Sequence, residues 1–350
     1  IAGGFTDTIF TNTEDTLVSL GSFDIFLSRY TTDGDELWFK NIVNGRDLQR
    51  ATHLTTGNDA NLILVGGFRD STSFEDALAP AKNNLNLHGF YSKFSPQDGS
   101  VNWWKSVESL HGPEGVLITK SSSQGDQIIL VGSFSDSIVI EKDTIVSKEA
   151  SKDAFIISSN LTGKVNWTNF ISGSSDEQAQ SLLIDENDLI YVSGYYDSPF
   201  LKTDYTTPDS LFEVSNMGGI DLFMTKYSSS GQLDWLNTTG GNGDSKISES
   251  EFVEDLIIVS GYYSDTLYWG ETIVTTNGAG DSDLFMGALD SQGSLKHIKT
   301  LSGTGNSHEE SKATFYTSSN TGFALIYSNS PVLRLEDDIL NSPNNNYHIT

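Results

Sequence analysis

Cysteine is absent from the 350 residues, which excludes disulfide bridges, thiolate metal sites and cysteine nucleophiles. Basic residues are scarce: 20 lysines and arginines face 47 acidic residues and leave a formal net charge of −27. A surface of that charge repels phosphate backbones and anionic lipid headgroups, so no nucleic-acid partner is expected. No apolar run approaches the roughly 18 residues that span a bilayer, so no direct membrane insertion is expected either.

Catalytic and cofactor motifs are missing as well. The six histidines form no HxH or HExxH spacing, and the chain has no GxSxG elbow, Walker loop or kinase motif set. Two glycine-rich stretches, GGNGD (240–244) and GTGNS (303–307), are followed by no predicted helix, whereas a phosphate-cradling loop requires one. The sequence therefore predicts no catalytic residue, no cofactor and no metal site.

Proline is sparse, at 7 residues, whereas glycine is abundant, at 32, and takes part in a repeat. The segment DLFMTKYSSSGQLDW (221–235) recurs as DIFLSRYTTDGDELW (24–38), HGFYSKFSPQDGSVNW (88–103), DAFIISSNLTGKVNW (153–167) and DLFMGALDSQGSLKH (283–297). Its phenylalanines, 64, 65, 68 and 62 residues apart, are Phe26, Phe90, Phe155, Phe223 and Phe285. A second recurring pattern, an apolar run that ends in Gly or Ser followed by an aromatic, has the same period. Two patterns with one period show that the chain contains an internal repeat.

Each repeat of about 65 residues is predicted to fold as four short strands. Runs such as LIIVSGYY (256–263) are apolar at consecutive positions, which in an antiparallel sheet means that both faces are covered. The predicted fold is therefore all-β, a β-propeller of four-stranded antiparallel blades. Residues 1–350 are predicted to be a single domain of five full repeats and a partial sixth, with 22 strands. This domain is expected to belong to a longer chain with six or seven blades, and the connection between second and third strands is expected to be a variable loop.

The motifs V-x-G-[FY]-x-D, D-x-F and G-x3-W recur together in five copies, as in VSGYYD (192–197), DLFMTKY (221–227) and GQLDW (231–235). Over essentially the whole chain this pattern resembles the bacterial seven-bladed β-propeller repeat (SBBP) family. The resemblance implies a secreted or cell-surface protein that often carries further domains. The chain departs from the pattern at His88, which replaces the Asp, and at His297, which replaces the Trp.

A residue that every blade carries serves a need that every blade has, so the recurrent positions are assigned to structure rather than to catalysis or metal binding. The acid is expected to accept backbone N–H bonds where a strand begins, and the Trp to pack between blades. Besides the five phenylalanines, these positions are Asp24, Asp153, Asp221, Asp283, Trp38, Trp103, Trp167 and Trp235. The better candidates for ligand contact are Trp104 and Trp269, which fall outside the pattern, and the paired tyrosines Tyr195, Tyr196, Tyr262 and Tyr263.

Asp-[Ser/Thr]-apolar triplets are frequent and resemble the O-glycosylation sequon of Bacteroidetes, which modifies exported proteins. This resemblance implies a glycoprotein with candidate sites at Thr8, Thr16, Ser137, Thr144, Ser210 and Thr266. The alternative is that the triplets that follow a second strand are part of the repeated sequence pattern and are not glycosylation sites.

Two classes of function fit these observations. The first is a non-catalytic binding or adhesive module of an exported bacterial protein, in a cell-surface or type 9 secretion complex, with a protein or glycan partner. The second is a glycan-active enzyme, which needs two carboxylates roughly 5–9.5 Å apart at the channel mouth. No acid pair stands out from the repeat, so the first class is favoured. Non-repeat acids and aromatics gathered in one pocket would favour the enzyme.

Overall fold

The computed structural model describes the chain except for residues 12–15, 71, 75–76, 80–85, 112–113, 148–150, 204–210, 215, 277–281, 304–311, 319–320, 329–331, 336–337, 342–346 and 350. The chain divides into two compact units, Ile1–Ser172 and Gly173–Thr350. The single domain expected over residues 1–350 stays a prediction. No helix long and apolar enough to cross a membrane occurs in the described part.

The first unit consists of strands joined by turns. They are β1 (Ala2–Phe5), β2 (Thr8–Phe10), β3 (Thr16–Val18), β4 (Asp24–Tyr30), β5 (Glu36–Gly45), β6 (Gln49–Thr56), β7 (Leu62–Phe68), β8 (Thr72–Phe74), β9 (Ala77–Ala79), β10 (His88–Phe94), β11 (Val101–His111), β12 (Val116–Gln124), β13 (Gln127–Ser135), β14 (Ser137–Ile140), β15 (Asp143–Val146), β16 (Lys152–Asn160) and β17 (Val165–Ile171). Their sheets have the orders β1-β4-β5-β8-β9, β15-β14-β11-β10-β7-β6, β12-β13-β16-β17 and β2-β3.

The second unit is built in the same way. Its strands are β18 (Glu177–Ile184), β19 (Ile190–Tyr196), β20 (Phe200–Lys202), β21 (Leu211–Glu213), β22 (Asp221–Tyr227), β23 (Leu233–Gly241), β24 (Ser245–Val253), β25 (Leu256–Ser264), β26 (Thr266–Trp269), β27 (Thr272–Thr275), β28 (Ser282–Leu289), β29 (Leu295–Gly303), β30 (Lys312–Ser318), β31 (Thr321–Ser328), β32 (Val332–Leu335), β33 (Asp338–Asn341) and β34 (Tyr347–Ile349). Their sheets are β18-β19-β22-β23-β26-β27, β24-β25-β28-β29-β32-β33, β20-β21 and β30-β31-β34.

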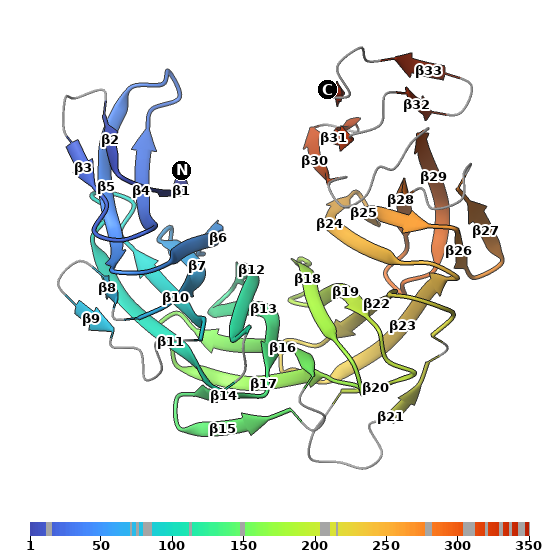
Figure 1. Cartoon of the computed structure of the whole chain (residues 1–350), viewed down its shortest axis with the longest axis horizontal. Coiled ribbons are helices and arrows are strands. Elements are labelled where there is room, and N and C mark those ends of the chain that lie inside the picture. Colours follow the sequence, from blue (N-terminus) through green and yellow to red (C-terminus); the bar gives the residue numbers. More distant parts are fainter. Residues whose placement is uncertain are drawn as a thin grey trace. The chain divides into compact units, whose positions relative to one another are not determined.

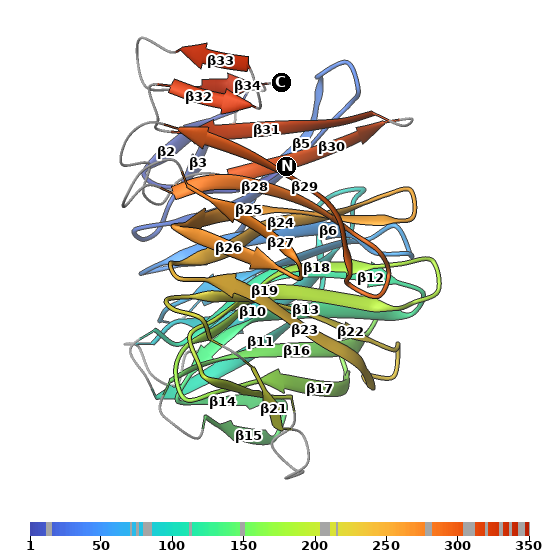
Figure 2. The ribbon, with the colours of Figure 1, turned by 90° about the vertical axis from the view of Figure 1, so that its right-hand side faces the viewer.

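Four antiparallel strands form each complete blade. Within each unit the blades follow one another in the order of the sequence, as Figure 1 shows. The complete blades are β6-β7-β10-β11, β12-β13-β16-β17, β18-β19-β22-β23 and β24-β25-β28-β29. Figure 2 shows β24, β25 and β28 side by side. Strands β1-β4-β5 are the second to fourth strands of the first repeat, and β30-β31-β34 are the first to third of the sixth. These are the blades of a β-propeller, and the 22 blade strands match the prediction.

The second strands are covered on both faces, as the unbroken apolar runs predict. Ile63, Leu64 and Val65 follow one another on β7, and each is 0% exposed. A strand on a half-solvated sheet would expose every second residue. The unbroken apolar run therefore indicates that this strand is packed between other layers on both faces.

Among the described residues, twelve of the 34 strands form six hairpins in the connection between second and third strands, and we call these hairpins straps. Four of them add to the fourth strand of the preceding repeat: β8 pairs with β5, β14 with β11, β26 with β23 and β32 with β29. The expectation of a variable loop was wrong, because strands of three or four residues are too short to show a period of two. Asp7, Asp136 and Asp265 start their straps with φ near 60° (59°, 64° and 62°), which favours Asp, Asn or Gly.

The two repeated markers lie opposite each other in the sheets. Phe155 pairs with Gly132, where a Cβ would lie 2.8 Å from the Phe155 ring and 2.0 Å from the carbonyl oxygen of Leu117. Leu117 precedes the bulge at which the register of β12 shifts. Only a residue without a side chain leaves room for the ring and the bulged strand together. The same pairing joins Phe26 to Gly3, Phe90 to Gly66, Phe223 to Gly194 and Phe285 to Gly261.

Candidate functional site

The repeated aspartates are buried at the start of their third strands. Asp221 accepts the backbone N–H of Met217 at 2.9 Å through Oδ2 and that of Gly241 at 3.0 Å through Oδ1. Asp24 accepts the equivalent pair of bonds in the first repeat, at 2.7 and 3.1 Å. Each carboxylate therefore joins the entry of the third strand to the end of the fourth. The other two repeated acids, Asp153 and Asp283, are 1% and 2% exposed.

Burial raises the pKa of Asp221 to about 6, although its two accepted backbone bonds act in the opposite direction. The negative charges of Asp197 and Asp244 raise this pKa further. A perturbed carboxyl can mark a catalytic acid, but here both oxygens are occupied by backbone donors. The position is therefore a structural one.

His88 stands where four other repeats have aspartate, and it accepts the equivalent bond from the end of the fourth strand. Its Nδ1 accepts the backbone N–H of Ser109 at 3.2 Å, and the ring is 0% exposed. The ring centroid lies 5.4 Å from that of Phe68. Ser109 lies 21 residues after His88, as Gly45 does after Asp24. An imidazole nitrogen accepts a bond only without its proton, so this contact needs the neutral ring.

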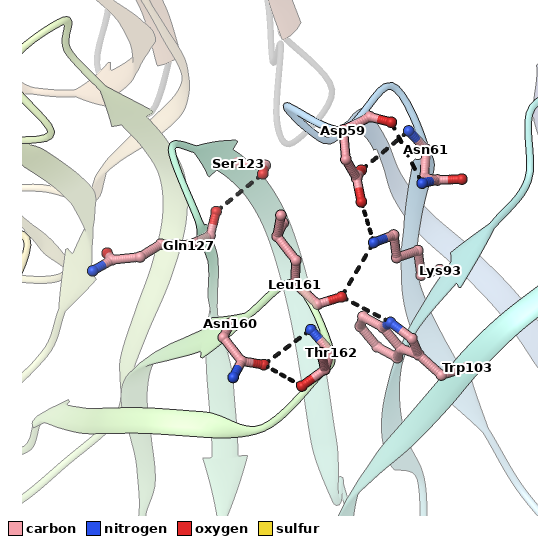
Figure 3. Close-up of polar contacts among 9 residues, drawn as sticks. All are labelled: Asp59, Asn61, Lys93, Trp103, Ser123, Gln127, Asn160, Leu161 and Thr162. Atoms are coloured by element: carbon pink, nitrogen blue, oxygen red, sulfur yellow. Dashed lines mark hydrogen bonds and ion pairs between the residues drawn. The ribbon is translucent and has the colours of Figure 1, made fainter.

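The repeated tryptophans pack on the turn of the following repeat in the same unit. Trp103 donates from Nε1 to the carbonyl of Leu161 at 3.0 Å, and a Cβ at Gly163 would lie 3.0 Å from its ring. Lys93 donates to the same carbonyl at 3.2 Å and pairs with Asp59, as Figure 3 shows. Trp38 packs on Gly99 and Trp235 on Gly293 in the same way, while Trp167 lies on β17. At these three contacts the tryptophan serves packing between blades.

A serine and a histidine meet on the first strands of neighbouring blades. His53 Nδ1 lies 3.2 Å from Ser121 Oγ, and burial, followed by the charge of Lys120, lowers the pKa of His53 to about 4. A nucleophile and base would need this contact. The first strands of the second unit, however, carry a Ser181–Ser250 contact of 2.6 Å with nearly the same sequence separation. The contact therefore links adjacent blades in both units, and nothing distinguishes it as a catalytic pair.

The candidate glycosylation residues differ in access. Ser137 and Thr266 are 3% and 7% exposed, and each donates to the aspartate before it, at 2.9 and 3.0 Å. The folded chain leaves these two hydroxyls little access to a glycan, and glycosylation at both stays a prediction. Thr16 and Thr144 are exposed, Thr8 is half-buried, and Ser210 lies outside the described residues.

Trp104 and Trp269, two of the candidates for ligand contact, hold straps to blades. Trp104 stacks on Phe74 of the strap β8-β9, with ring centroids 4.8 Å apart and planes 5° apart. Trp269, on the strap β26-β27, meets the edge of Phe285 at 5.7 Å. Of the tyrosines, Tyr196 and Tyr263 are buried, Tyr262 is half-buried, and Tyr195 donates to Gln178 at 2.8 Å.

One pocket in the first unit gathers basic side chains. It has a volume of about 260 Å³ and lies where β6 and β12 begin and β7 ends. Its charged lining residues are Arg50, Arg69, Lys152 and Glu114. The remaining lining residues are Leu48, Leu87, Gly115, Leu117 and Ser133. The sequence reasoning missed this pocket, because its residues come from two neighbouring blades and match no motif.

Two of its cations break the repeat. Arg69, which follows the second strand, is replaced in later repeats by Ser135, Asp197 and Ser264. Lys152, which precedes the repeated acid, is replaced by Phe23, Leu87, Ile220 and Ser282. The third, Arg50, corresponds to Leu117, Gln178 and Lys246. A blade is therefore complete without these charges, and their clustering needs a reason other than the fold.

No group of three or more histidine, aspartate or glutamate side chains converges as a metal site within the described part of the chain. The pocket itself offers cations and one carboxylate. Its chemistry therefore suits an anion.

No protein-family model matches the sequence. An uncharacterized WD repeat-containing protein of Acanthamoeba polyphaga mimivirus is 24% identical over 288 residues, which cover 71% of this chain and 20% of that protein. The chain thus spans about a fifth of the length of this relative. A mutant of the Synechocystis apocarotenoid oxygenase superposes with a TM-score of 0.43 and 11% identity, over 96% of this chain and 68% of that one. A score below 0.5 does not establish a common fold, whereas the WD-repeat relative agrees with propeller-type repeats.

Proposed function

We propose that this chain is a non-catalytic interaction module that binds a protein or glycan partner. The observation that carries the proposal is that the repeated residues make structural contacts, whereas the charged residues of the pocket do not belong to the repeat. The repeated Asp, Phe, Gly and Trp positions are occupied by contacts within and between blades. Two cations that break the repeat, Arg69 and Lys152, line one pocket at a blade end. Repeat proteins of this kind present extended surfaces on a rigid scaffold.

The enzyme alternative receives less support. A glycan-active enzyme needs two converging carboxylates, whereas the pocket at the blade end carries three cations and one acid. Asp221, the carboxyl whose pKa is raised to about 6, has both oxygens bonded to backbone N–H groups. Neither feature supplies an acid and a base to one substrate.

We further propose that the module works on an exported bacterial protein at the cell surface, in an envelope or secretion complex. The SBBP resemblance of the repeats supports this, and Thr16 and Thr144 are exposed where an exported chain would carry O-glycans. An intact mass equal to that of the bare polypeptide would remove the glycosylation part.

The test of the interaction role is capture of a partner from the envelope fraction of the source cell. The folded chain and a heat-denatured control are immobilised in parallel, and the bound proteins and glycans are identified by mass spectrometry. We expect a partner that only the folded chain retains. Retention of nothing beyond the denatured control would contradict the proposal, and release of reducing sugar from a retained glycan would show that the module is catalytic.

A further inference from the structure

We propose that the pocket lined by Arg50, Arg69 and Lys152 binds a compact oxyanion, a carboxylate or phosphate group on a small ligand. This goes beyond the interaction role, because the pocket can bind such a group whether or not the module captures a macromolecule. The argument rests on charge, on an unsatisfied donor and on size.

The first step is the charge of the pocket. Only 20 of the 350 residues are basic, and 5 of these are arginines, yet two arginines and a lysine line one pocket. Glu114, 64% exposed at its side chain, pairs with Lys152. Within the described residues Arg50 and Arg69 form no ion pair, so the pocket holds an excess of positive charge in a strongly acidic chain.

The second step is the mutual position of the two arginines. Partial desolvation lowers the pKa of Arg50, whose surface stays largely exposed, and the neighbouring charge of Arg69 lowers it further. Two like charges held together destabilise the folded state unless an opposite charge lies between them. An oxyanion bound between the guanidinium groups would remove this repulsion, and its oxygens match their forked donors.

The third step is an unsatisfied donor. The Nε of Arg69 is buried and donates no hydrogen bond to the described residues. More than nine-tenths of buried polar groups in proteins have a partner, and an orphan donor is costly. The backbone of Arg69 is bonded, since its N–H donates to Leu48 and its carbonyl accepts from Gln49. The backbone at Arg69 is therefore fixed, while the buried donor of its side chain is left for a ligand.

The fourth step is size. A volume of about 260 Å³ is close to the lower end of ligand pockets and suits one small ring or phosphate group. Leu48, Leu87 and Leu117 supply an apolar wall, and Ser133 adds a hydroxyl. The net charge of −27 repels polyanions at long range, so a ligand with one or two charges fits better than a nucleic acid.

The experiment is isothermal titration calorimetry of the whole chain with two probes, inorganic phosphate and glucuronate. They distinguish a phosphate ligand from a carboxylate-bearing sugar. We expect at least one probe to bind with a Kd of about 1 mM or lower, and to bind more weakly as salt is added. Binding of neither probe would overturn the proposal.

Variants locate the binding. Arg69→Met keeps much of the apolar stem and removes the unsatisfied donor, so it should weaken binding about tenfold or more while the melting temperature stays equal or rises. Arg50→Gln, at an exposed side chain, should weaken binding without disturbing the core. The matched control is Arg46→Gln, an exposed arginine of the same unit outside the pocket lining. Equal loss in Arg46→Gln, or unchanged binding in both Arg50→Gln and Arg69→Met, would refute the site.

Discussion

The repeated glycine of a blade packs closely against its surroundings, and this packing gives a sharp prediction for Gly132→Ala. The added Cβ would lie 2.0 Å from the Leu117 carbonyl oxygen and 2.8 Å from the Phe155 ring. Ordinary van der Waals contacts are 3.4 Å or longer, so one neighbour must move by more than 1 Å. The nearest atom belongs to the backbone of a bulged strand, which cannot rotate away as a side chain does.

The expected cost follows from these distances. Overpacking a well-packed core costs about 1–3 kcal/mol, and a backbone clash belongs at the upper end. Alanine reduces the entropy of the unfolded chain relative to glycine, which offsets up to about 1 kcal/mol. We therefore expect Gly132→Ala to lower the free energy of unfolding by about 2 kcal/mol.

The matched control is Gly4→Ala in the same unit. A Cβ there would meet its nearest atom, on the Phe23 ring, at 3.6 Å, so the change is expected to be neutral or slightly stabilising. Urea unfolding followed by circular dichroism measures both variants, and a loss of 2 kcal/mol lowers the midpoint by roughly 1 M. The reasoning would be refuted if Gly132→Ala kept the wild-type midpoint or if Gly4→Ala lost as much.

Three further predictions concern other repeated positions. His88→Ala leaves the buried N–H of Ser109 without its acceptor and should cost about 1–3 kcal/mol in urea unfolding, whereas His88→Asp should restore most of it. Trp103→Ala should cost about 3–5 kcal/mol, and Trp103→Phe much less, because Phe keeps the packing and loses one hydrogen bond; equal losses would contradict this. Burial raises the folded-state pKa of Asp221 above its unfolded value, so the folded chain binds an extra proton between about pH 4 and 6. Its contribution to stability therefore grows as the pH falls through that window, and Asp221→Asn should remove this contribution from the slope of melting temperature against pH; an unchanged slope would refute it.

Much of the blade could be predicted from the sequence, because the determinants are local and repeated. The positions of Phe155 and of Gly132 recur at one period, and their pairing across adjacent strands follows from the order of the strands. The unbroken apolar run Ile63–Val65 predicts a strand covered on both faces, and these residues are fully buried. The sequence also shows that His88 breaks the pattern, but it does not predict the hydrogen bond between His88 and Ser109.

The tertiary structure alone decided how the repeats are joined and where the charges meet. A strap adds to the preceding sheet through backbone hydrogen bonds, which leave little trace in the choice of side chains, so Val43–Phe74 pairing has no sequence signature. Arg50 lies on β6, Arg69 follows β7 and Lys152 lies on β16, so these residues are separated by up to 102 positions in the sequence. They share a pocket because the ends of neighbouring blades lie together. Their separation along the sequence does not predict this contact.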